Sequence, residues 1–247
     1  HLSGMLAAAE ANGHDLSSLR QYLVGAAPVP PSLIEACQRQ GLAVYHCYGS
    51  SEHPTVTSGV VDDPLDKQLH TEGRAIIGSE IRFVDDDGKD VPAGEEGEIC
   101  TRGPELFMGY LDPVLNEAAF LPGGWYRSGD IGRLDAEGFL LITDRKKDII
   151  IRGGENISSK EVEAVLLGLD AVADAAVVAT PDDRMGEIVR ACIVLSSGAS
   201  LSLDDIRNHF SAAGIAKQKT PERLSIIDEL PRNASGKVLK HALRNCS

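Results

Sequence analysis

The stretch DRKKDIIIRGGENISSKEVE, residues 144–163, constrains the fold of this chain more than any other segment. It opens with five charged residues, continues with three consecutive isoleucines and a pair of glycines, and ends at a helix start. Charged residues favour solvent and an isoleucine run favours a buried strand, so the chain passes here from an exposed segment into a new core. Ser158 and Glu161 match the S-x-x-E capping box, which predicts that a helix follows at once. The segment therefore marks a boundary between two domains.

The residue pattern changes across this boundary. Residues 1–65 alternate between β-like runs and helical spacing, which is typical of an α/β layer. Residues 66–145 carry short β runs separated by Gly, Asp and Pro, which predicts an antiparallel β subdomain. Residues 146–247 combine capped helices with strand-like runs such as AAVVA and ACIVL. We therefore predict an α/β plus α+β fold, with residues 1–145 in one domain and residues 146–247 in a smaller one.

Charge and cysteine content exclude several classes of protein. The 247 residues carry a net charge of -13 at pH 7, which disfavours nucleic acid or an anionic membrane as the main partner because like charges repel. Apolar runs are short and interrupted by acidic residues, so no transmembrane segment is expected, and the first residues lack a signal-peptide pattern. The five cysteines show no CxxC spacing, which favours reduced thiols over a disulfide or zinc framework. We expect a cytoplasmic protein.

Several short motifs hold candidate functional residues, although each alone also has an ordinary structural explanation. GAAP, from Gly25 to Pro28, suits close packing at the end of a strand, and YGSSE suits a tight loop with a helix cap. Asp130, in the run SGD, is a common turn residue. PRNASGK lacks the G-x-x-x-x-G-K-[ST] spacing of a P-loop, so Lys237 alone would be a surface lysine.

Taken together and in order, the motifs carry more information. GAAP, YGSSE, GEI, GY, GWYRSGD, DRKKD, GGENI and PRNASGK resemble the adenylate-forming superfamily, the AMP-dependent synthetases and ligases, over residues 22–244. Within it, NISSKEVE and QKTPE look most similar to acyl-CoA synthetases of the fatty-acid–CoA ligase type. The resemblance implies part of a doubly wound α/β layer and a β subdomain in a large AMP-binding domain, followed by a small, mobile C-terminal domain.

The resemblance also implies a two-step reaction with ATP, Mg²⁺ and coenzyme A. A carboxylic acid, such as a fatty or related acid, first forms an acyl-adenylate and pyrophosphate, and the CoA thiol then displaces AMP. By the resemblance, Ser51 donates to the phosphate, Glu52 holds Mg²⁺, and Lys237 bridges the substrate carboxylate and the phosphate. Lys147 occupies the hinge position, where a torsion change reorients the two domains.

The remaining implied contacts concern the nucleotide and coenzyme A. The residues that the resemblance places at ATP or AMP, besides Ser51, are Gly25, Ala26, Ala27, His46, Tyr48, Gly49, Asp130 and Arg145. Gly153 and Gly154 would let the backbone approach the pantetheine arm, which a Cβ would hinder.

Three positions depart from the family pattern. His46 stands where an amide or an acid commonly faces the adenine amino group, and a neutral imidazole still accepts a bond through one nitrogen. Ser128 replaces the usual Thr before Gly-Asp, and Asn233 replaces a common Thr near Lys237. We expect the last change to affect loop packing only.

One family motif is missing from the chain. The Ser/Thr/Gly-rich phosphate loop, which precedes all the others in the family, does not occur here, so we expect a C-terminal portion of a longer synthetase whose N-terminal part is absent. The 247 residues alone are then expected to lack synthetase activity. Two alternatives stay open, namely an acyl-AMP ligase that delivers to a carrier protein and a non-catalytic nucleotide-binding module.

Overall fold

The computed structural model describes residues 2–25, 31–233 and 236–244. The chain divides into two compact units, residues 1–142 and residues 143–247. Strand β9, Leu140–Arg145, runs from the first unit into the second. The structure divides the chain after residue 142, whereas the boundary was predicted after residue 145, at the end of this strand.

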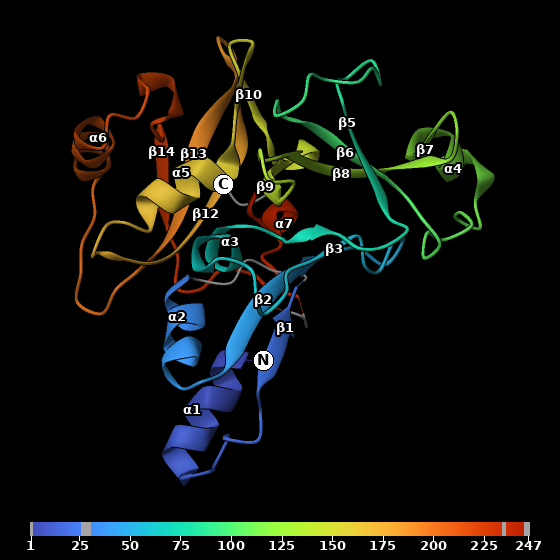
Figure 1. Ribbon diagram of the computed structural model, residues 1–247. Helices are drawn as coiled ribbons and strands as arrows, with labels where there is room; N and C mark the ends of the chain where they lie inside the picture. Colours follow the sequence, from blue (N-terminus) through green and yellow to red (C-terminus); the bar gives the residue numbers. More distant parts are fainter. Residues whose placement is uncertain (1, 26–30, 234–235, 245–247) are drawn as a thin grey trace. The chain divides into compact units, whose positions relative to one another are not determined.

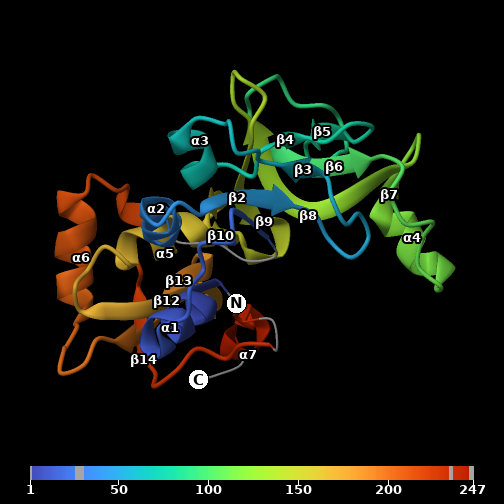
Figure 2. The ribbon, with the colours of Figure 1, turned by 60° about the horizontal axis from the view of Figure 1, so that its bottom comes forward.

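The first unit begins with an α/β layer. Strands β1 and β2 pair in parallel, and helix α2 connects them and lies beside β2 in both views (Figures 1 and 2). The sheet continues through the short antiparallel strands β3 and β4. Ile34 and Cys37 of α2 are fully buried against Val44 of β2 and form the apolar stripe of this helix. The elements are α1 (Leu2–Asn12), β1 (Gln21–Val24), α2 (Pro31–Arg39), β2 (Ala43–Tyr48), β3 (Thr57–Ser58), α3 (Leu65–His70) and β4 (Arg74–Ala75).

A five-stranded antiparallel sheet completes the first unit, as predicted. Its order is β5-β6-β8-β7, with β9 beside β8. Helix α4 lies next to β7 at one end of this sheet in both views (Figures 1 and 2). Asp112 caps α4 by accepting from the amide of Val114, and Pro113 occupies its first turn. The elements are β5 (Glu80–Val84), β6 (Gly97–Arg102), α4 (Pro113–Ala119), β7 (Phe120–Leu121) and β8 (Trp125–Leu134).

The second unit is an α+β domain built on a sheet of order β11-β10-β13-β12, with β14 parallel to β13. Helices α5 and α6 bury Leu166 and Phe210 on one face of this sheet, whereas Leu243 of α7 packs on the other face. The elements are η1 (Lys146–Asp148), β10 (Ile150–Arg152), β11 (Glu155–Ile157), α5 (Ser159–Leu166), β12 (Val172–Asp182), β13 (Gly186–Leu195), α6 (Leu203–Ala212), η2 (Lys217–Lys219), β14 (Arg223–Ile226) and α7 (Lys240–Arg244).

Two details of the opening segment differ from expectation. Only the middle of the isoleucine run, Ile150, is fully buried, while Ile151 is 56% exposed because successive side chains of a strand face opposite sides. The capping box before α5 forms only in one direction. Ser158 accepts from the amide of Glu161 at 3.2 Å, but the Glu161 carboxylate binds Lys219 at 2.7 Å. A lysine thus competes successfully with the backbone for this carboxylate.

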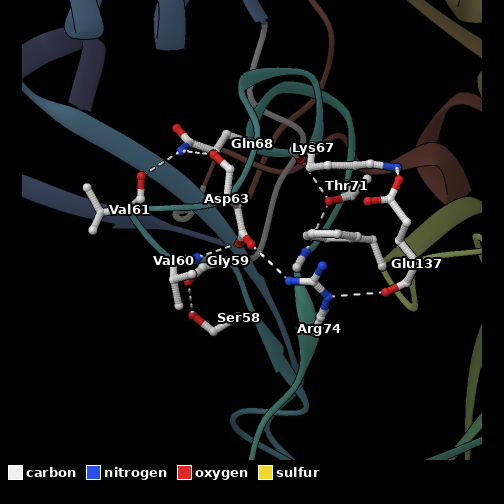
Figure 3. A network of polar contacts seen from close by, with 12 residues as sticks. Ser58, Gly59, Val60, Val61, Asp63, Lys67, Gln68, Thr71, Arg74 and Glu137 are labelled. Atoms are coloured by element: carbon white, nitrogen blue, oxygen red, sulfur yellow. Dashed lines mark hydrogen bonds and ion pairs between the residues drawn. The ribbon is translucent and has the colours of Figure 1, made fainter.

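A polar network connects the two sheets of the first unit (Figure 3). Lys67 of α3 bonds Asp135 at 2.6 Å and Glu137 at 2.8 Å, both in the turn between β8 and β9. Arg74 of β4 donates to Asp63 at 3.0 Å, and its guanidinium carbon lies 3.7 Å from the centre of the Phe139 ring. Phe139 is fully buried, so the network lies against the core of this unit. It thereby holds the turn between β8 and β9 on α3 and β4. Over the part of the chain that the structure describes, no helix has the length and apolarity to cross a bilayer.

Candidate functional site

Strand β2 and strand β8 bring two of the predicted nucleotide-binding residues into contact. Alternation along β2 buries His46 and Tyr48 on the same side of the strand, each at 7% exposure. The hydroxyl of Tyr48 donates to Oδ2 of Asp130 on β8 at 2.9 Å. Two motifs that are 82 positions apart, YGSSE and SGD, therefore form one polar site in the first unit.

Ser128 fixes the backbone that carries Asp130. Its hydroxyl donates to the carbonyl of Ile99 at 2.8 Å and accepts from the amide of Asp130 at 3.1 Å. Gly129 between them has a φ of 71°, a conformation that glycine adopts without strain. The departure from Thr to Ser at this position keeps the hydroxyl on which these bonds depend.

The loop after β2 is shaped by close backbone contacts. A Cβ at Gly49 would lie 2.0 Å from the carbonyl oxygen of Pro54, so only glycine fits there. The amide of Ser50 donates to the carbonyl of His53 at 2.9 Å, and the Ser50 hydroxyl accepts from the amides of Glu52 and His53 at 3.2 Å. These bonds close the loop, and they leave Ser51 exposed at its outer side.

The carboxylate of Glu52 is held by a tyrosine whose role the sequence did not indicate. The hydroxyl of Tyr110 donates to Oε1 of Glu52 at 2.8 Å. Burial raises the pKa of the Glu52 carboxyl, but hydrogen bonds, first among them that of Tyr110, outweigh burial and hold the pKa below its usual value. Asn116 of α4 in turn fixes Tyr110, because its side chain bonds the Tyr110 amide at 2.7 Å and the Tyr110 carbonyl at 3.0 Å.

An ionised Glu52 suits a hard cation. The described residues include no group of three or more His, Cys, Asp or Glu side chains able to hold a metal. Mg²⁺ is commonly bound by one or two carboxylates together with substrate phosphates, rather than by a cage of protein ligands. The carboxylate therefore fits Mg²⁺ that arrives with a nucleotide.

The other predicted nucleotide-binding residues of the first unit lie directly after β1 in the sequence and on β2. A Cβ at Gly25 would lie 2.7 Å from Sγ of Cys47, so the strand end approaches β2 too closely for any side chain. Ala26 and Ala27 lie outside the described residues. His46 pairs through Nδ1 with Glu72 at 3.5 Å, while its buried Nε2 has no partner among the described residues.

Lys237 lies in a tight loop of the second unit. Its side chain is exposed, and its amide donates to Oδ1 of Asn233 at 2.9 Å while its carbonyl accepts from the Asn233 amide at 2.9 Å. Arg232 and Val238 form an antiparallel bridge across the base of the loop. Asn233 therefore bonds both backbone polar groups of Lys237, and the expectation that its change from Thr affects loop packing only stays a prediction.

The glycine pair of GGENI forms a two-residue hairpin turn between β10 and β11. Arg152 pairs with Glu155 across it, and Gly153 and Gly154 have φ values of 59° and 89°. Positive φ at both central residues is the pattern of a type I′ turn. A Cβ at Gly153 would also meet Cε of Met185 at 2.6 Å. The turn accounts structurally for both glycines, and their contact with coenzyme A stays a prediction.

The segment predicted as a hinge forms a single 3₁₀ turn, η1. The amide of Ile149 donates to the carbonyl of Arg145 at 3.1 Å and closes this turn. Lys147 is exposed, and its carbonyl accepts from Arg244 at 2.7 Å. The predicted residues of the second unit are Arg145, Lys147, Gly153, Gly154 and Lys237, whereas the other predicted residues belong to the first unit.

Comparisons with known proteins identify the family of this chain. Residues 2–111 match the family model of AMP-binding enzymes, and residues 161–237 match that of the AMP-binding enzyme C-terminal domain. The medium-chain fatty-acid–CoA ligase of Escherichia coli (strain K12) is 47% identical over 232 residues, 93% of this chain and 41% of the ligase. The 2-succinylbenzoate–CoA ligase of Geobacillus sp. (strain WCH70) is 37% identical over 227 residues, 92% of this chain and 46% of that one.

Solved structures give the same result for the fold. The o-succinylbenzoate CoA synthetase of Bacillus subtilis, in complex with its acyl-adenylate intermediate, aligns with a TM-score of 0.84 at 35% identity and covers 100% of this chain and 49% of its own. The same enzyme with ATP and a magnesium ion aligns with a TM-score of 0.83 at 32% identity, over 99% of this chain and 54% of that one. The predicted fold class is confirmed. The chain spans about half the length of the relatives it matches.

Proposed function

Because this chain belongs to the AMP-binding family of adenylate-forming enzymes, we propose that it is part of an acid–thiol ligase that activates a carboxylic acid with ATP and transfers it to coenzyme A. The observation that carries the proposal is the bond of 2.9 Å between Tyr48 and Asp130, which unites two motifs on which the resemblance rests. The names of the relatives, which are CoA ligases, support the thioester as product.

In the first half-reaction a substrate carboxylate oxygen attacks the α-phosphorus of ATP, and the bond to the pyrophosphate oxygen breaks. Both reactants are anions, so the chain must supply donors and positive charge where they meet. Lys237 is the residue we assign to this task, with its ammonium between the carboxylate and the phosphate. A full charge there is worth several kcal/mol in a closed site. Ser51, exposed at the outer side of its loop, donates its hydroxyl to the phosphate.

The nucleotide itself is held by the remaining residues of the first unit. Asp130 accepts from the two ribose hydroxyls, and Tyr48 with the backbone at Gly25 flanks the adenine. His46 accepts from the adenine amino group through its buried Nε2, which has no partner among the described residues. Glu52 would hold Mg²⁺, which supplies charge neutralisation to the phosphates when bound.

The second half-reaction requires Lys237 to leave. The CoA sulfur attacks the acyl carbon of the adenylate, and AMP departs with the electron pair of the broken acyl–phosphate bond. Lys147 is the pivot we assign to this change, since it is exposed and lies in a single 3₁₀ turn near the start of the second unit. The hairpin turn at Gly153 and Gly154 then carries the backbone that approaches the pantetheine arm.

A fatty or related acid is the substrate class we propose, supported by the 47% identity to the medium-chain fatty-acid ligase. The acidic charge of the chain and its scattered cysteines support a cytoplasmic location. The test uses the protein as its gene encodes it, with any residues that precede His1. We expect pyrophosphate exchange that depends on a medium-chain fatty acid, and an acyl-CoA product when CoA is added. Exchange without acyl-CoA, but with acyl transfer to a carrier protein, would identify an acyl-AMP ligase. Micromolar AMP binding without any exchange would identify a non-catalytic module.

A further inference from the structure

The last helix of the second unit is bonded to the hinge segment. A single guanidinium nitrogen of Arg244, on α7, donates to the carbonyl of Lys147 and to Oδ1 of Asp148, each at 2.7 Å. We propose that Arg244 is a positioning residue that fixes the C-terminal end of the hinge to the segment carrying Lys237. The proposal rests on the function given above and adds to it the element that couples the pivot to the reactive lysine.

The bond to the hinge is of a strong type. The Asp148 carboxylate is 12% exposed and the Arg244 side chain 30% exposed, so the pair is partly shielded from water. Charge-assisted bonds from a guanidinium are shorter and stronger than neutral ones. Because Arg244 holds the carbonyl of Lys147, a torsion change at this residue has to occur at the backbone bonds that precede this carbonyl. The peptide that follows the carbonyl then moves together with α7.

The other end of α7 is held by a buried polar cluster. The ammonium of Lys240 lies 2.8 Å from Oε1 of Glu163 and donates to the hydroxyl of Ser159 at 2.7 Å. Ser159, which is fully buried, donates to Asp144 at 3.3 Å. Burial raises the pKa of the Glu163 carboxyl. Lys240 and the amide of Val177, which donates to Glu163 at 2.7 Å, lower this pKa but do not outweigh burial. Lys240 therefore anchors the start of α7 to the start of α5.

The middle of α7 is fixed as well. Leu243 is 4% exposed and packs in the core on this face of the sheet, and its carbonyl accepts from the buried Arg190 of β13. A helix of so few residues is marginal by itself, so these tertiary contacts determine its position.

The loop with Lys237 continues directly into this helix. The amide of Leu239 donates to the carbonyl of Pro231 at 2.7 Å, which closes the base of the loop one residue before α7 begins at Lys240. The loop, the helix and the end of the hinge are thus joined by consecutive bonds. A change of torsion at Lys147 would then carry Lys237 together with α7, and it would separate Asp144, which precedes the pivot, from Ser159.

Hydrogen exchange on the 247-residue chain tests the coupling without any activity. In Arg244→Gln we expect faster exchange both at the amides of residues 146–150 and at the amide of Lys237, with the amides of β12 and β13 unchanged. Arg244→Lys keeps the charge but provides a compact ammonium in place of the planar guanidinium. Its exchange rates at these amides should lie between those of the unaltered protein and those of Arg244→Gln. Arg207→Gln is the control, because Arg207 of α6 pairs with the exposed Asp204 at 2.8 Å on the surface of the same helix. Faster exchange confined to α7 in Arg244→Gln would overturn the coupling.

Activity of the protein as encoded tests the positioning role. Small misplacements of a catalytic group lower rates by about ten- to a hundredfold, so we expect Arg244→Gln to lower kcat of adenylate formation by that factor. The KM for ATP should stay within about twofold, since Arg244 is not assigned to the nucleotide. In a Lys237→Ala background, Arg244→Gln should have no further effect on this step. An equal loss in both backgrounds, or none in either, would overturn the proposal.

The two experiments also separate this proposal from the proposed function. If no carboxylic acid supports pyrophosphate exchange in the unaltered protein, the proposed function fails. The amide hydrogen exchange of Arg244→Gln still reports on the coupling in that case. If exchange of pyrophosphate is normal in Arg244→Gln, the function stands and the positioning role is wrong.

Discussion

Tyr110→Phe is expected to raise the pKa of Glu52, because it removes the hydrogen bond that holds this carboxylate. The hydroxyl of Tyr110 donates to Oε1 of Glu52 at 2.8 Å, and burial alone would raise the pKa of this carboxyl. A hydrogen bond to a charged group contributes about 1.5 to 3 kcal/mol, and partial exposure of Glu52 to water reduces this to about 1.4 kcal/mol. Because the hydroxyl no longer favours the ionised carboxylate, the pKa of Glu52 should rise in Tyr110→Phe.

The substitution is conservative in shape. The ring of Tyr110 packs edge-on against Phe107 with 4.8 Å between their centres, and a phenylalanine keeps this contact. The bonds from Asn116 to the Tyr110 backbone do not depend on the hydroxyl. The loss therefore concerns the carboxylate rather than the fold.

Carbon-13 NMR of labelled glutamate side chains measures this pKa directly. Tyr45→Phe is the matched control, because Tyr45 donates to Gln21 at 2.9 Å on an exposed surface. We expect a higher pKa of Glu52 in Tyr110→Phe only, and an acid limb of the adenylation rate shifted in the same direction. An unchanged or lower pKa in Tyr110→Phe would refute the account of how this ligand stays ionised.

Three further predictions concern the hinge and stability. Lys147→Pro should spare adenylate formation but slow thioester formation, as two half-reaction assays would show, and unchanged overall turnover would remove the hinge role. Burial raises the pKa of Asp135, but the bond from Lys67 and two backbone amides outweigh it and hold the pKa below 3.8. The stabilisation by the ionised Asp135 is thus complete above 3.8, the ordinary pKa of this side chain, and disappears as pH falls through its lower pKa in the folded state. Asp135→Asn should therefore lower the free energy of unfolding by about 1 kcal/mol at pH 7 but less at pH 3 in urea titrations, and an equal loss at both would contradict the assignment. Gly153→Ala should cost about 1 to 2 kcal/mol in the same assay, because of its positive φ and the contact with Met185, and an unchanged midpoint would contradict this.

The sequence predicted the parts of the fold that depend on local pattern. The antiparallel subdomain follows from short β runs separated by turn residues, and these signals act over a few positions. The pattern could not decide which isoleucine enters the core, because the run III offers no alternation, and packing in the core of the second unit selects Ile150. Nor could it predict that Glu161 would bind Lys219, 58 positions away, in place of its own helix end.

The candidate site was predictable as motifs but not as a geometry. YGSSE and SGD are recognisable in the sequence, and the contact between Tyr48 and Asp130 required the pairing of strands far apart in the chain. Tyr110 lies in the quoted GY, but its bond to Glu52 spans 58 positions and left no local signal. Arg244 likewise lies in an ordinary basic helix, and its bond to the hinge depends on tertiary packing.

The two half-reactions of Lys237→Ala test the central claim most directly. The protein as encoded would be assayed for pyrophosphate exchange and, separately, for thioester formation from supplied acyl-adenylate and CoA. The account predicts a loss of at least about a hundredfold in exchange, because the charge between two anions is gone, with thioester formation reduced by no more than about threefold. Equal losses in both half-reactions would contradict it.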